Sequence, residues 1–161
     1  MKKIFPLTLF AISGALGVQF VQPGSFVRQS SVRQSSVPAP ILAGAHADAH
    51  VFSILERSCQ NCHSLKTEWP VYSRVFPFSW IVEHDVQEAR THMNLSRWQI
   101  YDESEKSLLL SEIGSVARNH IMPPRRYTMI HPEAKLSEGE ANEVYDWTRS
   151  ERKLLKHSPE D

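Results

Sequence analysis

The segment Cys59-Gln60-Asn61-Cys62-His63 places two thiols three residues apart and an imidazole directly after the second thiol. These two cysteines are the only ones in the chain. In this order the thiols can add to the two vinyl groups of a haem as thioethers, and the histidine can reach the iron as an axial ligand. The sequence therefore predicts one covalently attached haem c, held by Cys59 and Cys62 with His63 on the iron.

Three other kinds of site also use a Cys-x-x-Cys pair. A thioredoxin-like redox pair needs a βαβ setting and a lowered thiol pKa, and the sequence shows no such setting. A structural zinc site needs four ligands, so these two cysteines would have to recruit two distant histidines. A plain disulfide between Cys59 and Cys62 is the remaining alternative.

Charge is distributed unevenly along the 161 residues, although the formal net charge is zero. The only charged side chains before Asp48 are basic: Lys2, Lys3, Arg28 and Arg33. From residue 48 onward the chain carries 14 basic and 18 acidic residues. This balance gives no indication of nucleic-acid binding. Two haem propionates would add to the negative charge, so we expect a preference for partners with a basic face.

Residues 1–22 have the pattern of a bacterial export signal, because two lysines precede an uncharged run from Ile4 to Val18. Ala15-Leu16-Gly17 offers a cleavage site, but the apolar stretch of about 18 residues is near the lower limit for a membrane span. Signal peptide and membrane anchor both stay open, with a preference for an uncleaved anchor. Covalent haem attachment in bacteria takes place outside the cytoplasmic membrane, so we expect a periplasmic location.

Residues 23–48 are rich in Ser, Gln, Pro and Ala and contain a local duplication, in which Val27–Ser31 is followed by the matching Val32–Ser36. This composition predicts a flexible linker that builds no core. A flexible chain of this length spans roughly 28 Å, so it would tether a haem domain to a membrane surface, or else be disordered without a function. We expect the haem domain over residues 49–157 and a short tail over residues 158–161.

Apolar residues recur at helical spacing throughout residues 49–157, whereas signals for β-strands are weak. The sequence therefore predicts an all-α, cytochrome c-like domain wrapped around one covalent haem. Its first helix would follow Asp48 as N-cap and carry the haem motif at its C-terminal end. The core side of this helix would hold both thiols, along a stripe of Val51, Ile54, Leu55, Cys59 and Cys62.

A second helix is predicted after Pro77, with Ser79 as its candidate cap and Asn94 as its stop. Its inner stripe would consist of Phe78, Val82, Val86, Ala89 and Met93. Irregular connections over residues 66–76 and 119–136 would wrap the edges of the haem.

Two capping boxes predict the starts of a third and a fourth helix. Asp102 pairs with Glu105 at the third, and Ser137 pairs with Glu140 at the fourth. The third helix would bury Leu109, Ile113 and Val116. The fourth would pack across the first helix through Ala141, Val144, Tyr145 and Trp147 or Thr148.

A haem bound through one histidine leaves a second axial position, and Met122 is the best candidate for it. Met122 lies 59 residues after His63, which allows two helices between the ligands. The two prolines that follow exclude helix and stiffen the loop that must present the thioether sulfur. Met93 is expected to pack inside a helix, and Met129 lies in a stretch without a rigid frame.

Three histidines could ligate iron in principle: His84, His120 and His131. We expect exposed or hydrogen-bonding positions for them, because a second histidine ligand would leave the proline-framed methionine unexplained. His/Met ligation raises the reduction potential and fills both axial positions, so the centre would transfer electrons to redox proteins in the periplasm or membrane. The alternative is a haem peroxidase-type enzyme, or a gas or redox sensor, in which the methionine is displaced.

Several longer segments share a pattern with one family of small single-haem c-type cytochromes. Besides the haem motif, they are Thr67-x-Trp69-Pro70-x-Tyr72-Ser73, Pro77-x-Ser79-Trp80, His84-Asp85-Val86, Asn94-x-Ser96-x-Trp98, Met122-Pro123-Pro124, and the stretch from Tyr127 through His131-Pro132-x-Ala134-x-Leu136-Ser137 to Trp147. Over about Val51 to Trp147 the chain resembles the bacterial haem-binding domain family, with Ala89-Arg90 standing where Gly-Arg is expected. The resemblance implies that His63 and Met122 are the axial ligands. It also implies that Trp69, Tyr72 and Trp80 line the haem pocket or form hydrogen bonds in it.

Overall fold

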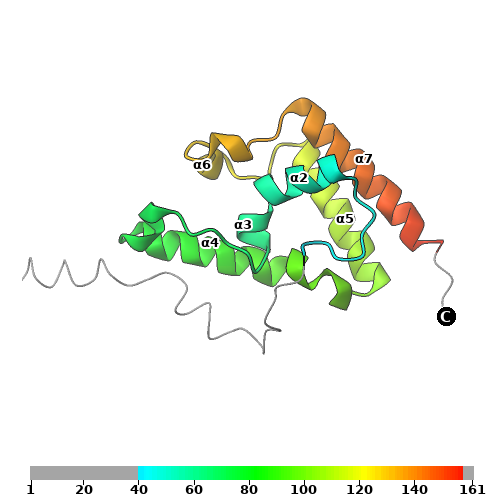
Figure 1. Cartoon of the computed structure of the whole chain (residues 1–161), viewed down its shortest axis with the longest axis horizontal. Coiled ribbons are helices and arrows are strands. Elements are labelled where there is room, and N and C mark those ends of the chain that lie inside the picture. Colours follow the sequence, from blue (N-terminus) through cyan, green and yellow to red (C-terminus); the bar gives the residue numbers. More distant parts are fainter. Residues whose placement is uncertain (1–39, 158–161) are drawn as a thin grey trace, which may run out of the picture. The chain divides into compact units, whose positions relative to one another are not determined.

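The computed structural model describes residues 40–157, and every regular element among them is a helix (Figure 1). The predicted all-α class is therefore confirmed. Residues 68–88 form one compact unit, and residues 40–67 together with 89–157 form the other. The longer helices are α2 (Ala49–Ser58), α4 (Phe78–His92), α5 (Glu103–Arg118) and α7 (Glu138–Leu155), and the shorter elements are α3 (Gln60–His63), α6 (Arg125–Thr128) and three 3-10 helices, η1 (Val71–Arg74), η2 (Leu95–Ile100) and η3 (Pro132–Ala134).

The predicted export signal or anchor over residues 1–22, the linker up to residue 39 and the tail over residues 158–161 lie outside the described residues. None of the helices between residues 40 and 157 has the length and apolar character needed to span a membrane.

Helix α2 begins where the sequence predicted. Asp48 is its N-cap, and Asp48 Oδ1 accepts a hydrogen bond of 2.8 Å from the backbone amide of Val51. Its core side buries Val51, Ile54 and Leu55. The helix ends at Ser58, however, because Cys59 adopts φ −120° and ψ −34°. The motif therefore does not continue the first helix, and the one-turn helix α3 carries its remaining residues.

Both predicted capping boxes are present, at Asp102 with Glu105 and at Ser137 with Glu140. They begin α5 and α7, which form the most extensive helix pair of the described structure. Helix α7 also packs against α2, as predicted, but α5 is its main neighbour. Val116 and Tyr145 are only half-buried, whereas the buried residues are Leu109, Leu110, Ile113, Gly114 and Ala117 on α5 and Ala141, Val144, Trp147, Thr148 and Glu151 on α7.

The hydrophobic core extends further toward the N-terminus than the sequence predicted. Ile41 and Leu42, assigned to the linker, are 1% and 2% exposed and pack with the core residues of α2, α5 and α7. The amide of Leu42 donates a 2.9 Å hydrogen bond to the carbonyl oxygen of Leu95. Glu151, on α7, accepts from the amide of His46 at 3.1 Å. The packed domain therefore includes the end of the predicted linker.

Helix α4 differs from its prediction at its first turn. It begins at Phe78, so Ser79 lies inside the helix rather than at its cap. Val86 and Met93 of the predicted inner stripe are buried, whereas Phe78 is 50% exposed. In the unit of residues 68–88, Tyr72 contacts Phe78 and Phe76 contacts Trp80, both edge to face, with ring centroids 6.4 and 4.9 Å apart.

The two connections predicted to be irregular contain short helices. Residues 66–76 include η1, and residues 119–136 include α6 and η3. Helix α4 ends at His92, two residues before the predicted stop at Asn94. The side chain of Asn94 instead accepts a hydrogen bond from the amide of Ser96 and caps η2. The chain between the longer helices is therefore more ordered than its composition indicated.

Gly114 sets how closely α5 and α7 approach each other. A Cβ atom added at Gly114 would overlap Thr148 Oγ1 and lie 3.3 Å from Tyr145 Cδ2. We expect Gly114→Ala to lower the free energy of unfolding by about 1–3 kcal/mol, because the helices would have to separate. Urea denaturation followed by circular dichroism measures this change.

Gly139→Ala is the matched control, since the added Cβ would meet nothing closer than Ser137 Oγ at 4.0 Å. Gly139 lies in the first turn of α7, where alanine is the better helix former, so we expect an unchanged or higher stability. Equal effects of the two substitutions would contradict a role of Gly114 in helix packing.

Candidate haem-binding site

The five residues of the haem motif occupy the junction of α2 and α3. The amide of Cys59 bonds to the carbonyl oxygen of Leu55 at 2.9 Å, and the amide of His63 bonds to the carbonyl oxygen of Cys59 at 3.0 Å. The motif thus forms one tight turn, which begins at the end of a helix that is anchored in the core. Cys59 and Cys62 are half-buried and are not joined by a disulfide.

The ring of His63 is oriented by a hydrogen bond to the backbone. His63 Nδ1 lies 3.2 Å from the carbonyl oxygen of Met93. A carbonyl oxygen only accepts hydrogen bonds, so the proton belongs on Nδ1, and Nε2 keeps its lone pair. Burial also lowers the pKa of His63 from its ordinary value, against the smaller raising effects of backbone hydrogen bonds with Met93 and Ala89. A neutral imidazole with an available Nε2 is the form of histidine that binds metals.

A hydrogen-bonded network holds the chain that follows His63. Arg90 Nε donates to the carbonyl oxygen of Ser64 at 2.7 Å, and its terminal nitrogen donates to Thr67 Oγ1 at 2.7 Å. Thr67 Oγ1 in turn donates to the carbonyl oxygen of Asn61 at 2.6 Å. Ser64 is fully buried. Arg90 therefore holds the segment that directly follows His63 in the chain.

The sequence did not identify Arg90, Thr67 or the carbonyl group of Met93 as parts of the site. An arginine placed between the apolar residues of a helix could have indicated Arg90, because a charged group on a core-facing stripe needs partners. No sequence signal could have identified Met93, since its backbone, rather than its side chain, makes the contact.

The environment of Cys59 bears on the alternative uses of the two cysteines. Burial, together with the neighbouring Cys62, raises the pKa of the Cys59 thiol to about 12, and Arg57 only partly offsets this effect. A redox-active Cys-x-x-Cys pair requires the opposite shift, toward a thiolate at neutral pH. Among residues 40–157, no three His, Cys, Asp or Glu side chains are grouped so that they could hold a metal ion. The raised pKa of the Cys59 thiol therefore disfavours the dithiol alternative.

The loop that carries Met122 follows α5 directly. The amides of Ile121 and Met122 both lie within hydrogen-bonding distance of the carbonyl oxygen of Val116, at 2.9 and 3.3 Å. Met122 is 41% exposed. Beyond the two prolines, the hydroxyl of Tyr127 accepts a 3.3 Å hydrogen bond from Asn61 Nδ2, inside the haem motif. The structure thus links the segment after Met122 to the segment that carries His63.

The other candidate ligands have different surroundings. Met93 is buried in the core and Met129 is 82% exposed. His120 Nε2 lies 2.9 Å from a carboxylate oxygen of Glu138, and His131 Nδ1 lies 3.0 Å from one of Glu133. His84 is mostly exposed, with the carboxylates of Asp85 and Glu88 each 3.8 Å away. All three histidines therefore have the exposed or hydrogen-bonding character that the sequence indicated.

The three aromatic residues implied by resemblance belong to the unit of residues 68–88. Trp69 and Tyr72 are half-buried, and Trp80 is 61% exposed. Their contact with a haem stays a prediction.

A model of the haem-binding domain family matches residues 14–150. The chain belongs to this family. Cytochrome c peroxidase of Escherichia coli (strain K12) is 27% identical over 100 residues, which cover 60% of this chain and 22% of that protein. This chain therefore corresponds to only a small part of the peroxidase. No solved structure matches it.

The residues of the motif fit the haem that the family implies. The two thiols lie in one turn and are not joined to each other. His63 can bind iron through Nε2, because Nδ1 forms a hydrogen bond with the carbonyl oxygen of Met93. The loop after α5 also exposes large apolar side chains, which are Ile121, Met122, Met129 and Ile130. Such a surface suits an apolar group better than it suits water.

Arg90→Met tests the network behind the motif. The substitution removes both hydrogen bonds of the guanidinium group, so we expect it to lower the free energy of unfolding by about 2 kcal/mol and to reduce the yield of haem-loaded protein. Urea denaturation and the ratio of haem to protein absorbance measure the two effects.

Arg74→Met is the control, because Arg74 is exposed and such substitutions change stability by less than about 0.5 kcal/mol. Arg90→Lys retains the positive charge but lacks the planar guanidinium group that donates both hydrogen bonds, so we expect an intermediate loss of stability and of haem-loaded protein. If Arg90→Met behaved like Arg74→Met, the two short hydrogen bonds would not stabilise the motif.

Proposed function

We propose that this chain is a c-type cytochrome domain that carries one haem c and transfers single electrons. Thioether bonds to Cys59 and Cys62 would retain the haem. The observation that carries the proposal is the 3.2 Å contact of His63 Nδ1 with the carbonyl oxygen of Met93, because it leaves Nε2 for iron immediately after the two thiols. A bound haem supplies an iron that alternates between the ferric and ferrous states.

In this proposal His63 Nε2 and the sulfur of Met122 would hold the iron of the haem. The backbone of Met93 holds the imidazole in one tautomer and one orientation. The attachment of the Met122 loop to the carbonyl oxygen of Val116 and the two following prolines limit the positions that the sulfur can adopt. A thioether ligand would favour the reduced state of a bound haem, which suits electron transfer.

The location and partners follow from the sequence. We infer export to the periplasm, with residues 1–22 as a signal peptide or membrane anchor and the residues up to about 40 as a tether. Residues 48–161 carry 14 basic and 18 acidic side chains, so redox proteins of the periplasm or membrane with a basic face would suit the domain, and nucleic acid would not.

The similarity to a cytochrome c peroxidase favours a second function, in which Met122 is displaced and the iron acts on peroxide or binds a gas. Met122 is 41% exposed, so water and small molecules can approach its side chain. The two functions share the attachment residues and differ in whether the thioether stays bound. The spectrum and the ligand binding of the reduced protein therefore distinguish them.

Removal of the cysteines tests covalent attachment. After expression with export and haem maturation, we expect the wild-type chain to retain haem stain in a denaturing gel. Cys59→Ala and Cys62→Ala should each keep one thioether, and their pyridine haemochrome band should shift to longer wavelength. The double variant should lose the stain.

Gln60→Ala is the matched control inside the motif, and we expect it to retain both thioethers. An unstained wild-type chain, or a stained double variant, would rule out attachment through these cysteines.

Met122→Ala tests the second axial ligand. We expect the ferric protein to lose its sulfur-to-iron charge-transfer band, the reduction potential to fall, and the ferrous protein to gain carbon monoxide binding. Met129→Ala, at an 82% exposed methionine in the same loop region, should change none of these. The second function would instead be supported if the wild-type protein bound carbon monoxide and turned over peroxide as well as the Met122→Ala variant does.

A further inference from the structure

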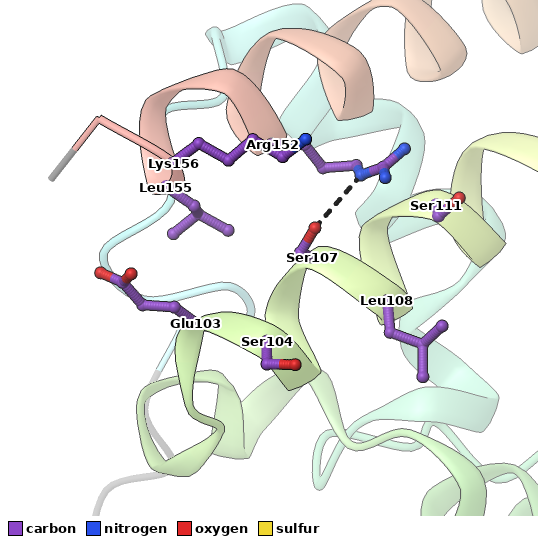
Figure 2. A pocket seen from close by; sticks show the side chains of 8 residues that line it. All are labelled: Glu103, Ser104, Ser107, Leu108, Ser111, Arg152, Leu155 and Lys156. Carbon is purple, nitrogen blue, oxygen red and sulfur yellow. Dashed lines mark hydrogen bonds between the residues drawn. The ribbon is translucent and has the colours of Figure 1, made fainter.

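Helices α5 and α7 leave a groove along their outer side. It consists of two adjoining hollows that share Ser111 and Arg152. One hollow lies at the start of α5 and the end of α7. There Arg152 Nε donates a 3.4 Å hydrogen bond to Ser107 Oγ across the groove, and Figure 2 shows this bond as a dashed line. The second hollow continues to Arg118 at the end of α5. None of the lining residues belongs to the candidate haem site.

The groove is basic, although the domain as a whole is not. Four cationic side chains line it, and Glu103 is the one carboxylate among its lining residues. The cations are Arg118, Arg149, Arg152 and Lys156. Within residues 40–157, no carboxylate lies within 4.0 Å of any of them, whereas Arg57 pairs with Glu140 at 2.7 Å. The groove therefore concentrates positive charge that the described residues do not neutralise.

Helix stability explains only part of this arrangement. Lys156 lies at the C-cap of α7 and Arg118 in the last turn of α5, where cations interact favourably with the helix dipole. Arg149 lies in the interior of α7 and gains nothing there from the dipole. Arg118 and Arg149 also lie over the ring of Tyr145, with centroid distances of 4.4 and 5.8 Å. The aromatic ring thus holds two like charges close together, which an anionic ligand would stabilise.

We propose that this groove binds an acidic, extended segment of another protein. Its length follows α5 from Glu103 to Arg118, which is roughly 22 Å at the helical rise, or about seven residues of extended chain. A single small anion would contact only part of this row of cations. A membrane surface is flat and would not enter a groove between two helices. Leu108, which is 70% exposed at the rim, offers a contact for one apolar side chain of such a segment.

The test uses the full-length chain and a fluorescent peptide of six glutamates around a central leucine, with binding followed by fluorescence anisotropy. We expect binding that weakens as salt is raised, because carboxylate contacts with exposed cations are screened. Arg149→Gln combined with Lys156→Gln should weaken binding about tenfold. Both residues are exposed, so the fold should be retained, and circular dichroism verifies this.

Lys66→Gln combined with Lys135→Gln is the matched control, since it removes the same charge from two exposed residues outside the groove. We expect it to leave the affinity within about twofold of the wild type. Equal losses in the two double variants, or equal binding of a peptide with glutamine in place of glutamate, would overturn the proposal. The proposal would also be overturned if the groove bound inorganic phosphate or phosphatidylglycerol vesicles but did not bind the acidic peptide. These measurements need no bound haem, so their outcome is independent of the proposed electron transfer.

Discussion

The contact between His63 Nδ1 and the carbonyl oxygen of Met93 is the constraint on which the candidate site depends. It connects the motif to the segment that follows α4, thirty residues further along the chain. Without this contact the imidazole could rotate about its side-chain bonds, and either nitrogen could carry the proton. With the backbone as acceptor, one tautomer and one orientation are favoured. Arg90 reinforces the same connection, because it reaches from α4 to the carbonyl oxygen of Ser64.

The pair α5 and α7 supports the site from a distance. Its close approach at Gly114 fixes the end of α5, and the carbonyl oxygen of Val116 there receives the amides of the Met122 loop. Beyond that loop, Tyr127 bonds to Asn61 in the motif. The helix pair thus determines where the sequence between its helices can lie, so packing far from the candidate site influences the positions of Met122 and Tyr127.

The sequence predicted the features that depend on local chemistry. Asp48 and the two capping boxes form contacts within three or four residues, so their positions could be identified from residue type and spacing. The motif of two thiols and His63 was recognised in the same way, and its role in holding haem stays a prediction. The features that it missed depend on distant contacts. Leu42 is buried because its amide pairs with Leu95 and its side chain joins the core, and nothing in the surrounding Ser- and Ala-rich composition indicates this.

The serines of α5 show how far packing alone explains a helix sequence. Ser104, Ser107, Ser111 and Ser115 follow the groove at spacings of three or four residues. Serine is a weaker helix former than alanine, because its hydroxyl competes for backbone hydrogen bonds. Ser104, Ser111 and Ser115 are exposed, so they gain no burial that would compensate. A helix selected only for stability would carry alanine or long charged residues there. Short hydroxyls opposite arginines instead keep the groove polar, and that of Ser107 accepts a hydrogen bond from Arg152 across it. A polar, basic groove is what the binding of an extended acidic chain requires.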